Sequence, residues 1–376
     1  APTGENREFP RGSDDLPEDT KEIKPHPHGI ELGVLMKLLK EASGVKLSGF
    51  LQTSFSRVSQ RVSDEICKAA KLSPRAATGS IPSHEVEKLY QAMQSAKIMA
   101  PPTDCLAPIG VRNLLAGLLK EVKAEFYSAT TRSPAVYRGN PFQIEIAIAY
   151  GGTLANEEMA RVIRFANRVP LLYQQSACSA FKSVCAVDWK NYGISQPGNG
   201  APVGPLVVMV HMASVWVPFT SESKEAIADY DEISKEIRLA LQECGRKLGT
   251  YLRKRRKQRL EADRRNIFER YIPDVAESLA TLTGGNERDL AATLQRIARL
   301  RTADADVVLD EDGKPVSVEG GSGKPRKKSP EDEFAKDESV VIIPENETVP
   351  ADEDLFEAGS GNGSADNRSR RKKRRR

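Results

Sequence analysis

The feature that most constrains this chain is a run of residues from Lys224 to Arg270 that contains no proline and only two glycines. Six apolar residues recur through it at intervals of three and four, the spacing of one narrow helical face: Ile233, Ile237, Leu241, Cys244, Leu248 and Leu252. At 1.5 Å per residue, such a helix would be roughly 70 Å long. That is more than a domain of this size needs for its own core. The sequence therefore predicts a projecting rod that begins at Lys224.

Prolines divide the chain before this rod. Residues 1–28 are charged and proline-rich, which is typical of a linker. Residues 29–102 then carry apolar residues at helical spacing and end at the breaker Pro101-Pro102. The helical signals in this part lie at Leu32 to Leu39, at Val58 to Ile66 and from Pro82-Ser83 to Met93. We expect a compact helical module.

Residues 103–223 carry mixed signals. Between Phe142 and Ile148, apolar residues alternate with Gln143, Glu145 and Ala147, which predicts a half-buried strand. The residues from Pro205 to Phe219 are rich in β-branched side chains and predict either an inner strand pair or one bent strand. Helices are predicted from Ile109-Gly110 to Leu119, at Glu157–Phe165 and around Ser179–Val187. The fold class expected is α+β, a sandwich with helices on one face.

The C-terminal part is divided by charge. Residues 224–300 contain the rod and a short helical segment from about Tyr271 to Leu300. Residues 301–376 are acidic, rich in Gly, Ser and Pro, and predict a disordered tail. The stretch 302–367 has 18 acidic and 6 basic residues, and the last nine residues hold eight cations. The rest of the chain carries a net charge of +8, which favours a polyanionic partner.

The residues that usually carry covalent chemistry form no recognisable pattern. The chain has five cysteines and no Cys-x-x-Cys pair, which predicts buried free thiols. His26 and His28 offer too few ligands for a metal site. No phosphate-binding glycine loop follows a strand, and no Ser or Cys lies in a nucleophile elbow. No apolar run approaches the about 20 residues of a membrane span. We expect no catalytic residue, no metal site and no membrane partner in this chain.

A basic cluster in the rod is a candidate DNA-binding site. It has six cations in seven residues: Arg253, Lys254, Arg255, Arg256, Lys257 and Arg259. Acidic partners four residues away are mostly missing, so the repulsion between these cations is uncompensated. This favours sequence-independent contact with phosphates, weakened by salt, over the alternative of a solvated helix surface.

Lys224 is a second candidate. A strand is predicted to end at Pro218, and Thr220, Ser221 and Ser223 could cap the helix that follows. A cation at a helix start is unfavourable unless an anion neutralises it. From the residues alone, Lys224 is either an ordinary exposed lysine in the first turn of the helix or a lysine suited to meeting a phosphate beside backbone N–H groups.

Several ordered motifs give the chain a family resemblance over about residues 20–285. They are Lys24-Pro-His-Pro-His-Gly29, Phe55-Ser-Arg-Val58, Ala100-Pro-Pro-Thr-Asp-Cys-Leu106, Pro108-Ile-Gly110, Tyr137-Arg-Gly-Asn-Pro-Phe142, Ala149-Tyr-Gly-Gly152, Phe165-Ala-Asn-Arg-Val-Pro-Leu-Leu-Tyr-Gln174, Val210-His-Met-Ala-Ser214 and the residues from Pro218 to Ala228. On these motifs the chain resembles the B subunit of DNA topoisomerase VI, the type IIB topoisomerase of archaea, plants and some bacteria.

The resemblance implies a role for each part. Residues 29–102 would be a helix–two-turns–helix domain and residues 103–223 a transducer domain with a ribosomal-protein-like fold. Lys224 would contact the γ-phosphate of ATP, and the rod would be a stalk that reaches the A subunit of the topoisomerase. The segment Tyr271-Ile-Pro-Asp-Val275 would help to dock that partner. In the family, two B subunits and two A subunits use ATP and Mg²⁺ to cleave one DNA duplex and pass another through it.

One departure from the family pattern leaves an alternative open. The GHKL ATPase domain that precedes these motifs in the family is not in this sequence, which indicates a fragment or a separately supplied ATPase. The chain alone is then expected to be inactive. The alternative is a non-enzymatic adapter that bridges an A-type subunit to DNA without ATP. The expected location is the cytoplasmic nucleoid, or the nucleus if the source is eukaryotic.

Overall fold

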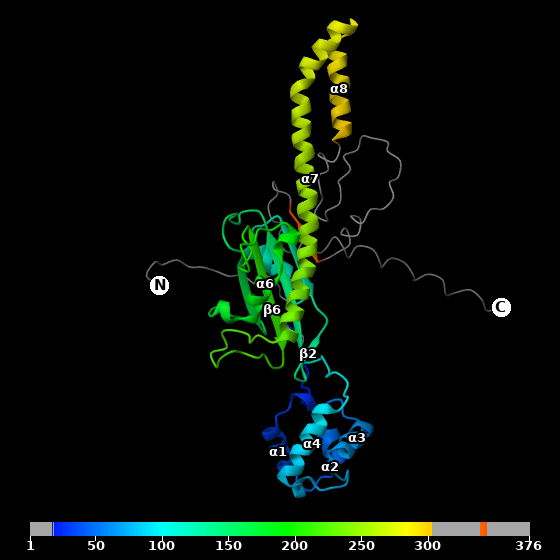
Figure 1. Cartoon of the computed structure of the whole chain (residues 1–376), viewed down its shortest axis with the longest axis vertical. Helices are drawn as coiled ribbons and strands as arrows, with labels where there is room; N and C mark the ends of the chain where they lie inside the picture. The colour runs from blue at the N-terminus through cyan, green and yellow to red at the C-terminus, as the bar shows by residue number, and fades with distance from the viewer. Residues whose placement is uncertain (1–16, 18, 303–338, 344–376) are drawn as a thin grey trace, which may run out of the picture.

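The computed structural model describes residues 17, 19–302 and 339–343. A helical module lies at one end, a sheet with its covering helices lies in the middle, and one long helix runs from the sheet to the other end (Figure 1). Among the described residues, no helix is both long enough and apolar enough to cross a membrane.

The helical module contains four α-helices around one apolar core. They are α1 (Leu32–Glu41), α2 (Leu47–Ser54), α3 (Gln60–Ala70) and α4 (Ser83–Ser95), with the 3-10 turns η1 (Pro27–Gly29) and η2 (Thr78–Ser80). Leu35, Phe50, Ile66 and Leu89 meet at its centre, each almost fully buried. The predicted helices correspond to α1, α3 and α4. Helix α2 was not predicted, because it is only eight residues long and contains Gly49.

The central sheet has seven strands in the order β5-β4-β6-β3-β1-β7, with β2 paired to β3. They are β1 (Phe126–Thr131), β2 (Ala135–Tyr137), β3 (Asn140–Tyr150), β4 (Arg161–Ala166), β5 (Val169–Pro170), β6 (Leu206–Ser214) and β7 (Val340–Ile342). All neighbours are antiparallel except β4 and β6. The predicted strand at Phe142–Ile148 lies within β3, in the middle of the sheet.

Helices cover both faces of this sheet, so the expectation of one covered face was wrong. Helix α5 (Val111–Glu121) packs on one face, while α6 (Ser179–Ala186) and α7 (Asp231–Thr283) pack on the other. Because both faces are covered, β3 is buried on both sides rather than half-buried: Glu145 and Ala147 are each fully shielded from solvent. A mixed α/β architecture is confirmed.

One further prediction in this part was wrong, and another was right only over part of its range. In place of the expected helix at Glu157–Phe165, the strand β4 begins at Arg161, and its residues alternate between buried and less buried positions. The helix-favouring run around Glu157 and Glu158 obscured that period of two. The β-branched run at Pro205–Phe219 forms the single strand β6, which ends at Ser214 and leaves Trp216 about half exposed. The helix predicted around Ser179–Val187 is present as α6.

The long helix exists, but it begins at Asp231 and not at Lys224. Asp231 and Glu232 occupy its first turn, where negative charge complements the helix dipole. With 53 residues it is about 80 Å long. It also continues through Pro273, the point at which the sequence predicted a separate segment, and ends where Gly284 adopts a left-handed conformation (φ 69°). Helix α8 (Glu287–Arg301) then folds back along α7 (Figure 1). Asn286 caps its N-terminal end.

The tail prediction was wrong at one place. Residues 340–342 form β7, an edge strand beside β1, within the stretch 301–376 that was predicted to be disordered. Residues 303–338 and 344–376, including the terminal basic residues, lie outside the described part of the chain.

Candidate nucleic-acid interface

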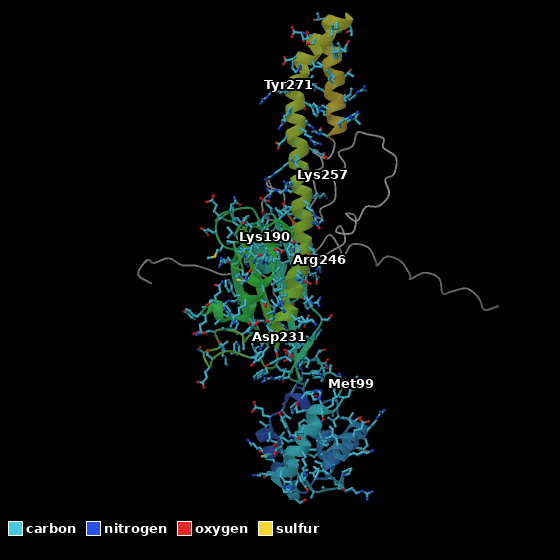
Figure 2. All side chains as sticks on the ribbon, in the orientation of Figure 1. Met99, Lys190, Asp231, Arg246, Lys257 and Tyr271 are labelled. Carbon is cyan, nitrogen blue, oxygen red and sulfur yellow. The ribbon has the colours of Figure 1, made fainter. Side chains whose placement is uncertain are left out.

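A cationic hollow of about 430 Å³ lies where α7 leaves the sheet. Four arginines of α7 line it, together with Lys190 and the rings of Tyr150 and Tyr192; the arginines are Arg253, Arg255, Arg256 and Arg259. We call this the basic hollow. None of the described residues that line it is acidic. Figure 2 shows Lys190 on the sheet domain close to α7. A concave surface lined by cations and partly aromatic suits a phosphate backbone.

Two glycines in α7 make the basic hollow possible. A Cβ added to Gly245 would lie 2.6 Å from Cε2 of Tyr192, and one added to Gly249 would lie 3.3 Å from the Tyr192 Cα. The 3-10 turn η4 (Trp189–Tyr192) therefore packs directly against the helix backbone. The side chain of Trp189 is fully buried and donates from Nε1 to the Val184 carbonyl oxygen at 2.8 Å, which anchors the turn that carries Lys190.

One arginine of the hollow is held by an acid from the sheet domain. Arg255 forms an ion pair with Glu125, whose carboxylate also accepts hydrogen bonds from Tyr251 Oη (3.2 Å) and from the Gly152 N–H (3.1 Å). Both side chains of the pair are mostly buried, with 23% of Arg255 and 13% of Glu125 exposed. This ion pair holds α7 to the sheet domain at the point where the helix leaves the sheet. Arg255 is thus a structural cation, whereas Arg253, Arg256 and Arg259 are exposed.

The structure brings four of the six predicted cluster residues together on the basic hollow. Lys254 and Lys257 do not line it; Lys254 is half-buried and Lys257 is exposed on α7 (Figure 2). Sequence reasoning missed Lys190, which comes from a different part of the chain. Its only local signal is its place between two aromatic residues, Trp189 and Tyr192.

Lys224 lies at the tip of a turn, seven residues before α7, so its predicted place in the first turn of the helix was wrong. Phe219 and Ile227 form the base of this turn, and the Thr220 N–H donates to the Ala226 carbonyl oxygen at 2.9 Å. Lys224 is exposed and has a φ of 55°, a left-handed conformation that a lysine rarely adopts. A fixed turn with a strained, exposed cation at its tip can present an ammonium group to an external anion.

The base of the turn is anchored on α6. Ala226 and Ile227 are buried, and the Ser179 N–H donates to the Ile227 carbonyl oxygen at 2.9 Å. Asp229 then accepts hydrogen bonds from Ser234 Oγ at 2.6 Å and from Lys182 Nζ at 3.3 Å. The hydrogen bond from Ser234 is the main reason why the pKa of Asp229 is below its usual range.

His26 and His28 hold the entry to the helical module. Their Nε2 atoms lie 3.1 Å and 3.0 Å from the carbonyl oxygens of Met99 and Ala96, and the Nδ1 of His26 accepts the His28 N–H. Both Nδ1 and Nε2 of His26 are therefore used when the ring is neutral. Burial lowers its pKa. Among the described residues, no group of three or more His, Cys, Asp or Glu side chains is arranged to hold a metal ion.

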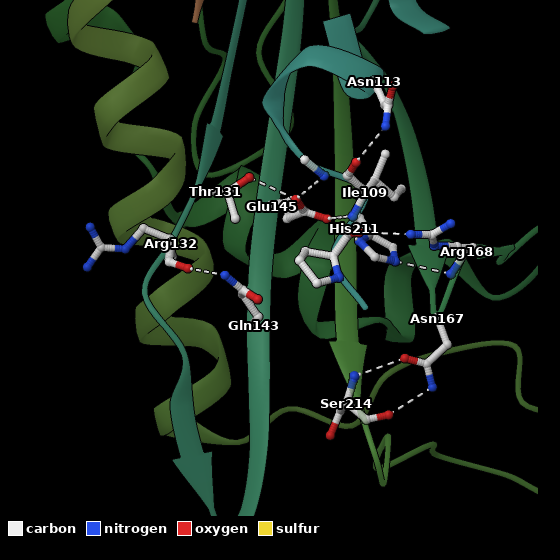
Figure 3. A network of polar contacts seen from close by, with 12 residues as sticks. Ile109, Asn113, Thr131, Arg132, Gln143, Glu145, Asn167, Arg168, His211 and Ser214 are labelled. Carbon is white, nitrogen blue, oxygen red and sulfur yellow. Dashed lines mark hydrogen bonds and ion pairs between the residues drawn. The ribbon is translucent and has the colours of Figure 1, made fainter. Parts of the chain in front are cut away.

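A buried polar network joins the strands β1, β3 and β6 to the start of α5 (Figure 3). Glu145 accepts from the N–H groups of Ile109 (2.7 Å) and Gly110 (2.8 Å), from Thr131 Oγ1 and from His211 Nδ1. Nε2 of His211 in turn accepts the Arg168 N–H at 3.1 Å. Burial by itself would raise the pKa of Glu145, but these four donors lower it overall. The network is a structural anchor, because the side chains of Glu145 and His211 at its centre are fully shielded from solvent inside the sheet domain.

Comparison with known proteins identifies the middle of the chain. Residues 101–264 match the family model described as the topoisomerase VI B subunit, transducer. This stretch is similar to the transducer of the topoisomerase VI B-subunit family. This confirms the family resemblance seen in the sequence.

Three archaeal relatives, each named as the B subunit of type 2 DNA topoisomerase 6, show the extent of the similarity. The Methanosarcina acetivorans protein is 45% identical over 296 residues, which are 79% of this chain and 48% of that protein. The Archaeoglobus fulgidus protein is 39% identical over 79% of this chain and 49% of its own length. The Pyrococcus furiosus protein is 34% identical over 85% of this chain and 63% of its own length. The chain thus spans about half the length of the first two relatives.

A likeness among solved structures is weak. The crystal structure of the DNA gyrase B-subunit from Myxococcus xanthus shares 18% sequence identity with a TM-score of 0.23, over 38% of this chain and 40% of that one. A likeness of this size supports no structural argument.

Proposed function

We propose that this chain is the transducer and stalk of a topoisomerase VI B subunit, and that it couples ATP binding and hydrolysis to double-strand DNA cleavage and strand passage. The products would be relaxed and decatenated DNA. The observation that carries the proposal is continuity: the Lys224 turn is anchored on α6 at the root of α7, and α7 runs from there to the far end of the molecule without a break (Figure 1).

Lys224 is proposed as the sensor of the ATP γ-phosphate. Its ammonium group is exposed at a turn whose base is buried. An anion that binds Lys224 therefore acts on a turn that is held firmly against the sheet domain. A charge-assisted contact of this kind is strong enough to favour one position of the turn over another. The body of ATP and its Mg²⁺ would be held by an ATPase domain that is not among the described residues.

The far end of α7 is proposed as the docking site for the A subunit of the topoisomerase. Apolar side chains are exposed around the predicted segment, where Phe268, Tyr271 and Val275 have between 44% and 56% of their surface open to solvent. Such a patch on a projecting hairpin fits a protein partner. In the complete assembly, two B subunits and two A subunits would form a heterotetramer on DNA, in the nucleoid or the nucleus.

The remaining parts are assigned by position. Residues 29–102 would be the helix–two-turns–helix domain, and residues 103–223 would be the transducer. The basic hollow would hold a DNA duplex by its phosphates, without reading sequence. A non-enzymatic adapter would need the same basic hollow and the same docking patch at the far end of α7. It would have no use for a strained lysine at the Lys224 turn.

The Lys224→Ala variant, made in a complete B subunit and assayed with the A subunit present, tests the coupling. We expect ATP hydrolysis and strand passage to slow by about tenfold or more, the loss of roughly one charge-assisted hydrogen bond. Lys235→Ala, which removes an exposed lysine from the second turn of α7, is the matched control. Normal relaxation kinetics in Lys224→Ala would remove the switch role and favour the adapter.

Neutralising the exposed arginines of the basic hollow tests the DNA contact. The triple substitution of Arg253, Arg256 and Arg259 to Gln should weaken DNA binding and reduce the slope of log affinity against log salt by about one for each lost phosphate contact. The triple substitution of Arg288, Arg296 and Arg299 to Gln removes three exposed arginines from α8 and should change neither. An unchanged slope in the first variant would make the hollow a solvated surface.

A further inference from the structure

The segment Ser339–Ile343 belongs to the acidic tail, yet it is built into the sheet. In β7, Val340, Val341 and Ile342 pair with Ser128, Tyr127 and Phe126 of β1. Val341 and Ile343 are buried beside α5, while Val340 and Ile342 pack toward the α7 side. Both side-chain faces of the segment therefore contribute to the core, which is the mark of a specific docking contact rather than of loose association.

This segment lies along the part of α7 that leads to the basic hollow. At one end, Lys247 donates a hydrogen bond to Ser339 Oγ, and the Ser339 carbonyl oxygen accepts the Ala129 N–H at 2.9 Å. At the other end, the Ile343 N–H donates to the Glu125 carbonyl oxygen at 2.8 Å. Glu125 is the residue whose side chain pairs with Arg255. The chain therefore leaves the sheet next to the hollow.

The sequence that follows has the charge of a competitor for phosphates. Residues 344–367 contain seven acidic residues and no lysine or arginine, and the first of them, Glu345, is two residues beyond Ile343. Chain geometry alone keeps its Cα within about 7 Å of the Ile343 Cα. A short tether of this kind gives an effective concentration on the order of millimolar.

We infer that the C-terminal segment is an intramolecular competitor of DNA at the basic hollow. Ser339–Ile343 is its anchor, and the acidic residues after Ile343 are the anion that DNA phosphates must displace. The inference rests on the proposed DNA contact of the hollow. It lies outside the transducer match, which ends at residue 264.

The acidic residues are tested by a neutral-tail variant of the full chain, in which all seven become Gln or Asn: Glu345, Glu347, Asp352, Glu353, Asp354, Glu357 and Asp366. Affinity for a labelled DNA duplex of mixed sequence is measured by fluorescence anisotropy over a range of salt. We expect an affinity on the order of tenfold higher at low salt and a difference that shrinks as salt rises. The same affinity as the parent chain at every salt concentration would overturn the inference.

The anchor is tested separately by the double substitution Val341→Ser and Ile343→Ser, which leaves the charge unchanged. It should raise DNA affinity in the same direction and speed hydrogen exchange at the Ala129 amide, which donates to Ser339. The double substitution Val307→Ser and Val308→Ser is the control, with the same chemistry elsewhere in the tail. Faster exchange at Ala129 with unchanged DNA affinity would overturn the role of the anchor.

Two further chains separate this inference from the proposed function. The triple variant of Arg253, Arg256 and Arg259 is measured beside the others. If this variant keeps the DNA affinity and the salt slope of the parent chain, the proposed DNA role of the basic hollow has failed. If it loses affinity while the neutral-tail variant equals the parent chain, only the competitor has failed. A chain that ends at Asn367 lacks the terminal cations and should bind DNA more weakly than the parent, because its acidic residues remain.

Discussion

The two halves of α7 share one helix but have different surroundings. In the inner half, residues 231–252, a continuous stripe from Ile233 to Leu248 is completely buried against the sheet and α6. In the outer half, residues 253–283, only Ile272 and Ala276 are buried, and the neighbouring layer is the single helix α8. The inner half is therefore part of the core of the sheet domain. The outer half depends on helix propensity, on the Arg255–Glu125 ion pair near its start and on packing against α8, so it contributes little to the core of the sheet domain.

The largest expected difference between the halves comes from truncating a leucine in each. Leu241 is fully buried in the inner half, and Leu241→Ala should reduce the free energy of unfolding by about 2–5 kcal/mol. Leu260 is 55% exposed in the outer half, and Leu260→Ala should change it by less than about 0.5 kcal/mol. Urea denaturation followed by circular dichroism measures both. Equal losses in the two variants would contradict the division of the helix.

A smaller effect is expected where the inner half meets η4. Gly245→Ala places a Cβ against the Tyr192 ring and should cost about 1–3 kcal/mol, from which up to about 1 kcal/mol of helix propensity is recovered. It should also weaken DNA binding, because the displaced turn carries Lys190. Gly117→Ala in α5 is the control: nothing lies within 4 Å of its new Cβ, so the same substitution should stabilise the protein by up to about 1 kcal/mol. Stabilisation by Gly245→Ala would show that Tyr192 moves aside.

The smallest expected effect appears only in acid and is confined to the sheet domain. The pKa of Glu145 is lower in the folded state than its ordinary value of 4.5. Its contribution to stability is therefore complete above about pH 5 and is lost as the pH falls through the lowered folded-state pKa. The free energy of unfolding should decrease over this range, and it should decrease less in Glu145→Gln. If the free energy of unfolding depends on pH equally in the parent protein and in Glu145→Gln, Glu145 is not the group responsible.

The sequence predicted the elements whose patterns are long and regular, and it missed those that depend on distant contacts. The apolar stripe of α7 and the alternation in β3 could be read directly, because each keeps one period over many residues. The start of α7 could not, since the cap signals at Thr220 to Ser223 belong to a turn that is held by α6. Nor could β7, whose three residues gain their partners only when β1 and α5 are already in place.

The candidate site divides in the same way. Adjacent cations made Arg253 to Arg259 visible in the sequence, whereas Lys190 joins them only because two glycines let η4 approach the helix. The ion pair that makes Arg255 structural needs Glu125, which is 130 residues away in the sequence. The sequence shows where cations are dense. It does not show which of them form ion pairs within the protein.

Pro273 gives the outer half of α7 a mechanical property of its own. A proline has no N–H, so the carbonyl of Glu269 lacks the usual backbone donor four residues further on. Bending at this position breaks no additional hydrogen bond, whereas bending elsewhere in the helix would. The outer half of α7 is thus stiff up to Pro273 and bends more easily at this proline, about three turns before the helix ends. In the assembly proposed above, a rotation at the start of α7 would reach the docking segment through this bendable position, so the docked end could stay in place while the angle of the helix changes.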